Sequence, residues 1–553
     1  MIGRVPALYG IDGRIPALYG IIRHDLAVPS LAIVVKTIYS GSLFQGWDDV
    51  GFHGSRLATP NADLLAYSGV ALGRYYTHCV CTPSRAALLT GKFAYTLGMH
   101  GYPLTNGEDR GLPVTEKILP QYLKELGYAT HLVGKWHVGR SRTEYLPTSR
   151  GFDTYFGHKG GGIDYYEYTA EETWNTGEVS GLDLTRNTTP SWDVEGYITD
   201  IYTDEAKTVI EAHDKSKPLF LMVAHSAPHC GSDGAALQAP PEVVRSFRYI
   251  ESPARRIYAA MVKKLDDSLG EVMKALADKG MLDDTIVVFI ADNGGMTTGL
   301  SANFANNFPL RGLKFSPFEG GIRVAGAIWA AKIAATRHLW DGYMHVVDWL
   351  PTILGAIDAN IPSDLDGINQ WNNMFPNSSS KREEFFEIDD YIGFNMIVSG
   401  NYKLVKGTVK EEYSNYQGAD LRGLIGDAPL YEDTLKNSKM YSVLEQIGKP
   451  FNMDDINIRH LMTVKCKEKP DSQVFSCNNN TFCLFDIIED PCETKDISSE
   501  KPDIVATLLR KLQEELKRVV ARPAVYRDPR ARPSLFNYTW SPWADGCFVK
   551  MSR

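Results

Sequence analysis

From about residue 46, the chain alternates between amphipathic segments and short segments that are almost wholly apolar. Residues 118–128 and 255–280 place apolar side chains every three or four positions, which predicts helices. Residues 218–226 and 284–295 are nearly continuous apolar runs, which are typical of strands buried on both faces. The same reading predicts helices at 59–70, 200–214 and 345–357, and strands near 71–77 and at 129–136 and 324–330. This alternation predicts an α/β fold with helices on both faces of a sheet.

The pattern changes at about residue 376. Residues 395–407 have the alternation of a hairpin, and residues 503–520 form one amphipathic helical segment. We therefore expect a large domain over 46–375 and a smaller α+β domain over 376–553 that closes on it. Residues 1–45 fit neither domain, because they begin with a near-repeat of GRVPALYG and GRIPALYG.

Size and charge narrow the functional classes. A chain of 553 residues with 44% hydrophobic composition can bury a large core. Its net charge of −9 argues against a nucleic-acid binder, which should carry a basic footprint. The apolar stretch at 31–35 is too short to span a bilayer, so no transmembrane segment is expected.

The cysteines and glycosylation sequons bear on the compartment. Cys466, Cys477, Cys483, Cys492 and Cys547 crowd the tail, and the closeness of Cys483 to Cys492 suggests a local disulfide. N-x-S/T sequons lie at Asn187, Asn377, Asn479 and Asn537. Together these features favour an oxidising, glycosylating compartment, although no clear signal peptide is present. A cytosolic protein with reduced thiols is the alternative.

Polar residues follow the ends of several predicted strands. They are Cys81 and Arg85, Lys135 and His137, His229, and Asp292 with Asn293. In open α/β sheets the ligand crevice lies beyond the carboxyl ends of the strands, so we expect these side chains to converge on one site.

The residue types suit an anion and a hard cation. Arg85, Lys135 and the histidines offer positive charge and donors to an oxyanion. Asp292 and Asn293 offer the oxygen ligands that calcium prefers. Pro83 predicts a helix that begins near Cys81, and a helix N-terminus also attracts anions. Each of these short strings alone is as readily a strand end or a turn; their shared position favours a site.

The string CTPSRAALLTG at 81–91 resembles the sulfatase signature, C-x-P-x-R followed by a small and apolar run. GWDDVGFHGS, GKWHVG, LPTSRGFDTYFG, FIADNGG and PLRGLKFSPFEGGIR resemble the arylsulfatase B branch of that family. The resemblance covers most of the chain from Gly46 onward. It implies an alkaline-phosphatase-like large domain with a mixed, mostly parallel sheet, and a smaller C-terminal domain with an antiparallel sheet.

The resemblance also implies roles for individual residues. Cys81 would be oxidised to formylglycine by the formylglycine-generating enzyme, and one hydroxyl of its hydrate would attack sulfur. His137 would act as the base that expels the bound sulfate, while Lys135 and Arg85 would orient the diol. His229 and Lys314 would contact the sulfate, and His229 would protonate the leaving alcohol. Asp292, Asn293 and the modified Cys81 would bind Ca²⁺.

The implied substrate is a sulfated sugar or an aryl sulfate, above all N-acetylgalactosamine-4-sulfate in glycosaminoglycans. The implied location is lysosomal or secreted. Because protonated imidazole both binds sulfate and donates to a leaving group, the two histidines suggest an acidic optimum.

The match fails at the first strand. The family places two calcium-binding aspartates before the Gly-Trp pair, where this chain has Leu43 and Phe44. Asp48 and Asp49 follow the tryptophan and are out of register. Either residues 1–45 are a wrong or alternative start, which we favour, or the site is impaired and the protein binds sulfated glycans. A phosphatase or phosphodiesterase of the same superfold would use Ser or Thr at position 81, so Cys81 argues against that class.

Overall fold

The computed structural model describes residues 45–231, 237–299, 302–331, 338–375, 378–407, 409–416, 419–467, 477 and 482–545, and the backbone of residues 33–34. Within these residues, none of the helices combines the length and the apolar character needed to cross a membrane. Leu43 and Phe44 lie outside the described residues.

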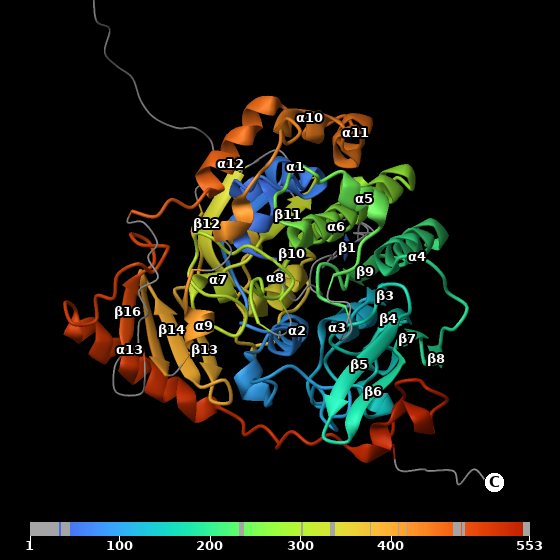
Figure 1. Cartoon of the computed structure of the whole chain (residues 1–553), viewed down its shortest axis with the longest axis horizontal. Helices are drawn as coiled ribbons and strands as arrows, with labels where there is room; N and C mark the ends of the chain where they lie inside the picture. Colours follow the sequence, from blue (N-terminus) through green and yellow to red (C-terminus); the bar gives the residue numbers. More distant parts are fainter. Residues whose placement is uncertain are drawn as a thin grey trace, which may run out of the picture.

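A ten-stranded mixed sheet forms the centre of the molecule (Figure 1). From edge to edge its strands are β12 (His338–His345), β2 (Val70–Tyr76), β11 (Gly326–Ala330), β10 (Ile286–Ile290), β1 (Ile33–Val34), β9 (Leu219–Ala224), β3 (Ala129–Gly134), β4 (Thr154–His158), β7 (Leu184–Arg186) and β8 (Thr189–Pro190). The run from β10 to β4 is parallel, whereas β11 and β7 are antiparallel to their neighbours. The parallel run aligns the carboxyl ends of its strands along one edge.

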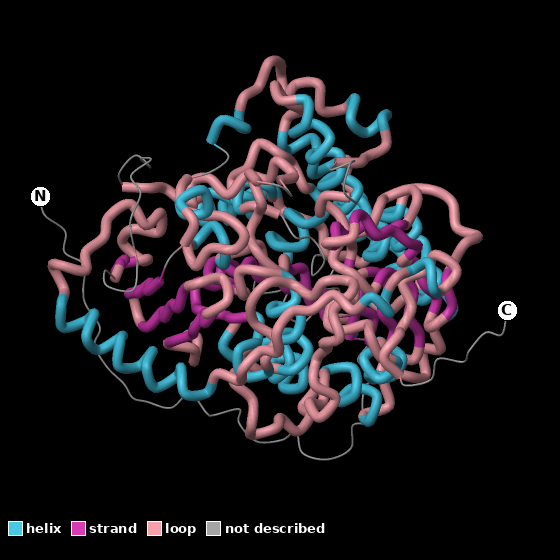
Figure 2. The backbone as a smooth tube through the Cα atoms, turned by 60° about the horizontal axis from the view of Figure 1, so that its bottom comes forward, coloured by secondary structure: helices cyan, strands magenta, loops and turns pink. Residues whose placement is uncertain are grey.

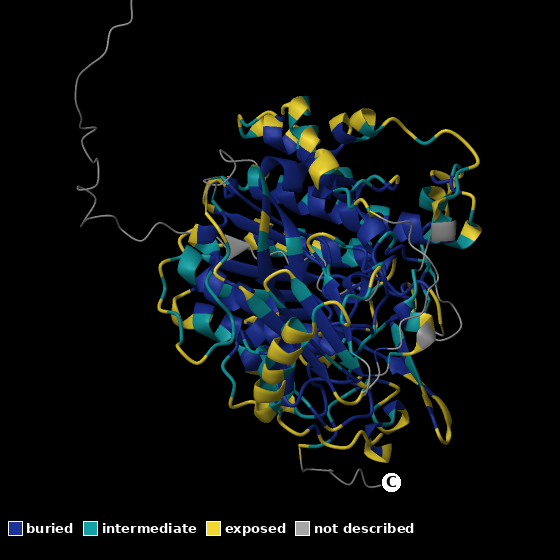
Figure 3. Cartoon of the chain, turned by 90° about the vertical axis from the view of Figure 1, so that its left-hand side faces the viewer, coloured by how far each residue is buried: buried dark blue, intermediate teal, exposed yellow. Residues whose placement is uncertain are grey.

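Helices cover both faces of this sheet, because successive side chains of each strand point to opposite sides. Val287 packs with α1 (Pro60–Ser68), α4 (Ile198–Ala212) and α6 (Pro253–Asp278), whereas Val288 packs with α2 (Cys81–Thr90), α3 (Leu119–Glu125) and α8 (Trp349–Ala356). Figure 3 shows the strands buried between these layers. The predicted fold class is therefore confirmed.

A second sheet is antiparallel and has four strands, β13 (Glu384–Asp389), β14 (Phe394–Ser399), β15 (Tyr402–Gly407) and β16 (Cys483–Asp486). The predicted hairpin is β14–β15. The long helix α13 (Pro502–Glu515) packs on this sheet (Figure 2). Met396 and Leu484 of the small sheet belong to the same apolar cluster as α2 and α8. The domain boundary near residue 376 stays a prediction.

Smaller elements complete the described fold. β5 (Thr169–Trp174) and β6 (Gly177–Leu182) form a separate two-stranded sheet, which the sequence did not predict. Short helices α5 (Pro241–Arg245), α7 (Glu319–Ile322) and α9 (Glu411–Ser414) lie in the long connections. Helices α10 (Tyr431–Lys436) and α11 (Lys439–Gln446) pack beside α1 in the upper part of Figure 1, and α11 also contacts α6. Helix α12 (Asn457–Met462) contacts β12.

The predicted Cys483–Cys492 disulfide is wrong. Cys483 pairs with Cys477, and Cys492 pairs with Cys466. Cys483 begins strand β16, and the strand and its following turn separate it from Cys492. The Cys477 carbonyl accepts a hydrogen bond from Gly407 N at 2.7 Å, which places Cys477 at the end of β15, beside the start of β16. Among the sequons, Asn187 and Asn537 are exposed, while Asn377 and Asn479 lie outside the described residues, as does Cys547.

Candidate active site

Helix α2 presents Cys81 as its first residue, directly after strand β2, as the position of Pro83 predicts. The Cys81 side chain is fully buried at the N-terminus of this helix. The loop before it is held by Glu387 of β13, whose carboxylate accepts hydrogen bonds from Cys79 N at 3.2 Å and from His78 Nδ1 at 2.5 Å. A residue of the small sheet therefore fixes the approach to Cys81.

Side chains from three strand ends meet around Cys81. Its Sγ lies 3.2 Å from His137 Nδ1, just beyond β3. Arg85 Nε donates to Asp292 Oδ2 at 3.2 Å, just beyond β10, and Arg85 Nη1 donates to the Lys135 carbonyl at 2.9 Å. The predicted convergence of these residues is what the structure shows.

His229 and Lys314 face the same cluster. The positive charges of Lys135 and Lys314 add to burial in lowering the pKa of His229. Lys314, in turn, lies close enough to Cys81 and Asp292 for both to act on its pKa, which burial lowers. The backbone of Lys314 donates to Gly295 O at 3.1 Å, which ties this segment to the loop after Asp292 and Asn293.

The hydrogen bonds of His137 fix which nitrogen is free to accept a proton. Its Nε2 lies 3.0 Å from the Leu104 carbonyl, which can only accept, so Nε2 carries the hydrogen. In the neutral ring, Nδ1 therefore presents its lone pair to Cys81 Sγ. Burial first, and then the charge of Lys135, hold the pKa of His137 well below its usual value. A neutral imidazole is the form that a base requires. The acidic optimum expected from the sequence assumes protonated histidines, and the lowered pKa of His137 does not favour that form.

The cluster has more buried cationic donors than its own residues satisfy. Lys135 Nζ and Arg85 Nη2 are buried and have no hydrogen-bond partner among the described residues. Burial lowers the pKa of Lys135 to about 7, and the nearby Cys81 opposes that shift. Buried donors without partners are costly, so the site favours a ligand that supplies several acceptor oxygens.

Asp292 and Asn293 offer oxygens that suit a hard cation. Asp292 Oδ1 and Asn293 Oδ1 are buried and accept no hydrogen bond from any described residue. The described residues contain no cluster of three or more His, Cys, Asp or Glu that could hold a metal. These two oxygens therefore fit part of a calcium coordination sphere, which takes six to eight oxygens.

The Asp49 carboxylate is fully used in contacts that hold the local structure together. It accepts from Gly46 N at 2.6 Å, Asn306 N at 3.1 Å and Tyr258 Oη at 2.5 Å, and it pairs with Arg255 at 2.5 Å. These contacts fill its oxygen sites, which agrees with its being out of register for the metal.

Sequence reasoning missed several groups that position the site. Glu387 accepts a hydrogen bond from Cys79 N, although the two residues are 308 positions apart in the sequence. No local sequence pattern could reveal that contact. Thr82 Oγ1 donates to the His137 carbonyl at 3.0 Å and accepts from Leu104 N at 3.1 Å. Cys230 lies beside His229, with its Sγ 3.4 Å from His229 Nδ1.

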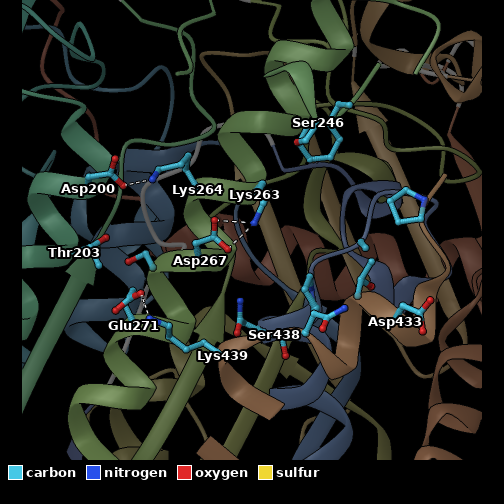
Figure 4. Close-up of a pocket in the computed structure, with 18 of the residues that line it drawn as sticks. Asp200, Thr203, Ser246, Lys263, Lys264, Asp267, Glu271, Asp433, Ser438 and Lys439 are labelled. Carbon is cyan, nitrogen blue, oxygen red and sulfur yellow. Dashed lines mark hydrogen bonds and ion pairs between the residues drawn. The ribbon is translucent and has the colours of Figure 1, made fainter. Parts of the chain in front are cut away.

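A spacious cavity lies elsewhere, beside α6. It measures about 690 Å³, and its walls come from α4, α6, α10 and α11 (Figure 4). None of the predicted site residues lines it. Its lysines pair with neighbouring carboxylates, as Lys264 does with Asp200 at 2.5 Å and Lys439 with Glu271 at 2.5 Å. This cavity is therefore separate from the cluster around Cys81.

The sequence model of the sulfatase family matches residues 44–359, more than half of the chain and all the predicted site residues. The chain belongs to the sulfatase family. This sulfatase is accordingly a hydrolase of sulfate esters. It is 33% identical to arylsulfatase J of Mus musculus over 503 residues, covering 90% of this chain and 78% of the relative.

Two further comparisons support the same assignment. This sulfatase is 29% identical to N-acetylgalactosamine-6-sulfatase of Homo sapiens over 395 residues, which covers 68% of this chain and 72% of the relative. The crystal structure of Ps i-CgsB in complex with k-i-k-neocarrahexaose superposes with a TM-score of 0.68 at 25% identity. That match covers 91% of this chain and 96% of the other.

Proposed function

We propose that this sulfatase removes the 4-sulfate of N-acetylgalactosamine in glycosaminoglycans, using formylglycine made from Cys81 and a calcium ion. The observation that carries the proposal is the 3.2 Å contact between Cys81 Sγ and the unprotonated Nδ1 of His137. The human relative is an N-acetylgalactosamine-6-sulfatase, which supports the sugar. The 4-position rests on the strings around Cys81, Lys135 and Lys314, which resemble the arylsulfatase B branch.

Formylglycine, once hydrated, supplies a hydroxyl nucleophile at position 81. His137 Nδ1 takes up a proton at the position that Cys81 Sγ occupies. Lys135 Nζ and Arg85 Nη2 orient the diol, and Lys314 binds the sulfate oxygens. Because these cations are already in place, they stabilise the charge that develops during the reaction.

His229 serves the leaving alcohol. Its Nδ1 donates to the Cys230 carbonyl at 2.5 Å, and this bond orients the ring, which donates a proton to the leaving oxygen when it is protonated. Asp292 and Asn293 would hold calcium, which would polarise a sulfate oxygen.

A lysosomal or secreted location is part of the proposal. Its support is the pair of disulfides in the C-terminal part and the exposure of two sequon asparagines, Asn187 and Asn537.

Mass spectrometry of the peptide that contains Cys81 tests the nucleophile. Protein produced together with the formylglycine-generating enzyme should carry the aldehyde at position 81 and should release sulfate from a 4-sulfated disaccharide faster than from its 6-sulfated isomer. Cys81→Ala should abolish release, while Cys79→Ala, a change to a buried thiol two positions earlier, should leave the modification intact. An unmodified thiol at position 81 would refute the proposed nucleophile, and a preference for the 6-sulfate would refute the proposed substrate.

A second candidate function is the binding of sulfated glycans without turnover. Leu43 and Phe44, where the family has two aspartates, favour it, because losing two anionic ligands should weaken calcium binding severely. Calorimetric titration should show weak calcium binding in this chain and binding at least about 10-fold tighter after Leu43→Asp with Phe44→Asp. The matched control is Leu430→Asp with Leu461→Asp, which adds two carboxylates at exposed leucines and should leave calcium binding unchanged. Tight binding by the unchanged chain, with sulfate release, would exclude the binding-only function.

A further inference from the structure

Three aromatic side chains gather beside Lys314, at the edge of the cluster around Cys81. Tyr102 and Phe315 have ring centroids 5.8 Å apart, and Phe315 stacks on Tyr413 at 6.0 Å with an interplanar angle of 27°. Tyr102 is 47% exposed, and the other two are half-buried. We call Tyr102, Phe315 and Tyr413 the aromatic platform.

The platform is tied to the catalytic loops by backbone hydrogen bonds. Phe315 N donates to the Cys79 carbonyl at 3.1 Å, two residues before the proposed nucleophile. Tyr102 lies two residues before Leu104, whose carbonyl accepts from His137 Nε2. Phe315 and Tyr413 both pack against the apolar cluster that contains Cys81. The platform therefore has a fixed position relative to the sulfate-binding residues.

The third side chain comes from a different part of the chain and is anchored separately. Arg311, three residues before Lys314, donates from Nη1 to the Ser414 carbonyl at 3.0 Å. Gly312 N donates to the Asn415 carbonyl at 2.9 Å. These bonds hold helix α9, and with it Tyr413, against the segment that carries Lys314 and Phe315.

Phe315 adopts a backbone conformation that bulky residues avoid, with φ of 73°. Such a backbone is strained and persists where the surroundings enforce it, often at ligand sites. Here the strained backbone places an aromatic ring directly after Lys314, whose Nζ lies 5.1 Å from the ring centroid. The ring packs against the apolar cluster on one side and is left half-exposed.

We infer that the aromatic platform stacks on a pyranose ring of the saccharide that carries the sulfate. The C–H face of a pyranose is apolar and weakly positive, so it matches the electron-rich face of an aromatic ring. Lys410 lies 5.4 Å from the Tyr413 ring centroid and is exposed, which adds a positive charge suited to an acidic sugar. The inference rests on the proposed function, and it adds that the protein selects a sulfated oligosaccharide rather than the sulfate group alone.

Calorimetry on the Cys81→Ala form, which cannot turn over, tests the platform directly. The probes are a 4-sulfated chondroitin tetrasaccharide and inorganic sulfate. Tyr102→Ala with Tyr413→Ala should weaken tetrasaccharide binding by about 10-fold and leave sulfate binding unchanged, because each stacked ring contributes a fraction of the affinity. Phe315 is left in place, since its strained backbone would confound the result.

Two further variants separate stacking from other effects. Tyr102→Phe with Tyr413→Phe keeps both rings and should restore tetrasaccharide affinity. Tyr526→Ala removes a 65% exposed tyrosine that is not part of the platform and should change neither affinity. Equal tetrasaccharide affinity in the parent and the Tyr102→Ala, Tyr413→Ala form, or no tetrasaccharide binding at all, would overturn the platform. A platform effect in the Cys81→Ala form, together with an unmodified thiol at position 81 in the unchanged protein, would instead overturn the proposed catalysis and leave the platform standing.

Discussion

At the scale of single residues, the hydrogen-bond partners of a side chain decide what it can do. Both His137 and His158 are buried histidines near Lys135, and burial lowers the pKa of each. They differ in their contacts, since His158 Nδ1 meets the Tyr202 hydroxyl at 2.8 Å while His137 Nδ1 meets Cys81. His137 also has φ of 60°, a left-handed backbone unusual for a residue that is not glycine. The combination of strain and a directed lone pair supports the proposed role of His137 as the base.

Replacing His137 by Asn should reduce kcat for a sulfate ester about 10²–10⁴-fold, the usual effect of losing a general base. Asparagine tolerates the left-handed backbone, so we expect little loss of stability. Steady-state kinetics with 4-nitrophenyl sulfate measures the effect, and the melting temperature checks the fold. His131→Asn changes a half-buried histidine on β3, the strand that precedes His137, and should leave kcat unchanged. An unchanged kcat in His137→Asn would remove the residue from the catalytic role.

At the scale of elements, the sequence predicts what local patterns encode. The apolar runs at 218–226 and 284–295 became β9 and β10, and the periodicity at 255–280 became α6, because burial on both faces or on one face leaves a periodic trace. The polar residues after these strands met because parallel strands end at one edge of the sheet.

Contacts between distant segments leave no such trace. Nothing near Cys483 shows that β16 begins there, so proximity in sequence suggested the wrong disulfide. Glu387 on β13 supports Cys79 across the boundary between the two sheets, and its neighbours in the sequence give no sign of that contact. The platform likewise joins Tyr102, Phe315 and Tyr413, which come from three separate segments of the chain.

At the scale of the whole molecule, a buried charge network joins the two sheets. Lys403 of β15 pairs with Glu319 of α7 at 2.9 Å and with Glu493, beyond β16, at 2.7 Å, and all three side chains are fully buried. Glu319 also accepts from the Tyr76 hydroxyl of β2 at 2.9 Å and lies 3.5 Å from Arg323. One lysine therefore balances carboxylates that belong to the large-sheet and small-sheet regions, which predicts that the two regions unfold together.

Lys403→Met removes the cation between these carboxylates and should destabilise the protein by about 3–5 kcal/mol near neutral pH, the usual cost of leaving a buried charge without its partner. The melting temperature measured by calorimetry should fall, still as one transition. Lys406→Met lies on the same strand, is half-buried and forms none of these ion pairs, so it should change the melting temperature little. If the melting temperature of Lys406→Met also fell by a large amount, the strand would be sensitive to any substitution, and the loss in Lys403→Met could not be assigned to the charge network.

The deficit of Lys403→Met should depend on pH in a direction that the network fixes. Burial already raises the pKa of Glu493 to about 7, and Lys403 opposes that shift. Without the lysine, the folded-state pKa rises further, so the folded variant binds protons that the unfolded chain, with glutamate pKa near 4.3, releases. The stability from this protonation is complete below the unfolded pKa and is lost as pH rises through the folded pKa. The difference in melting temperature between Lys403→Met and the parent should therefore shrink as pH falls from 8 to 5.5, whereas a constant difference would show that the lost interaction is packing and not charge.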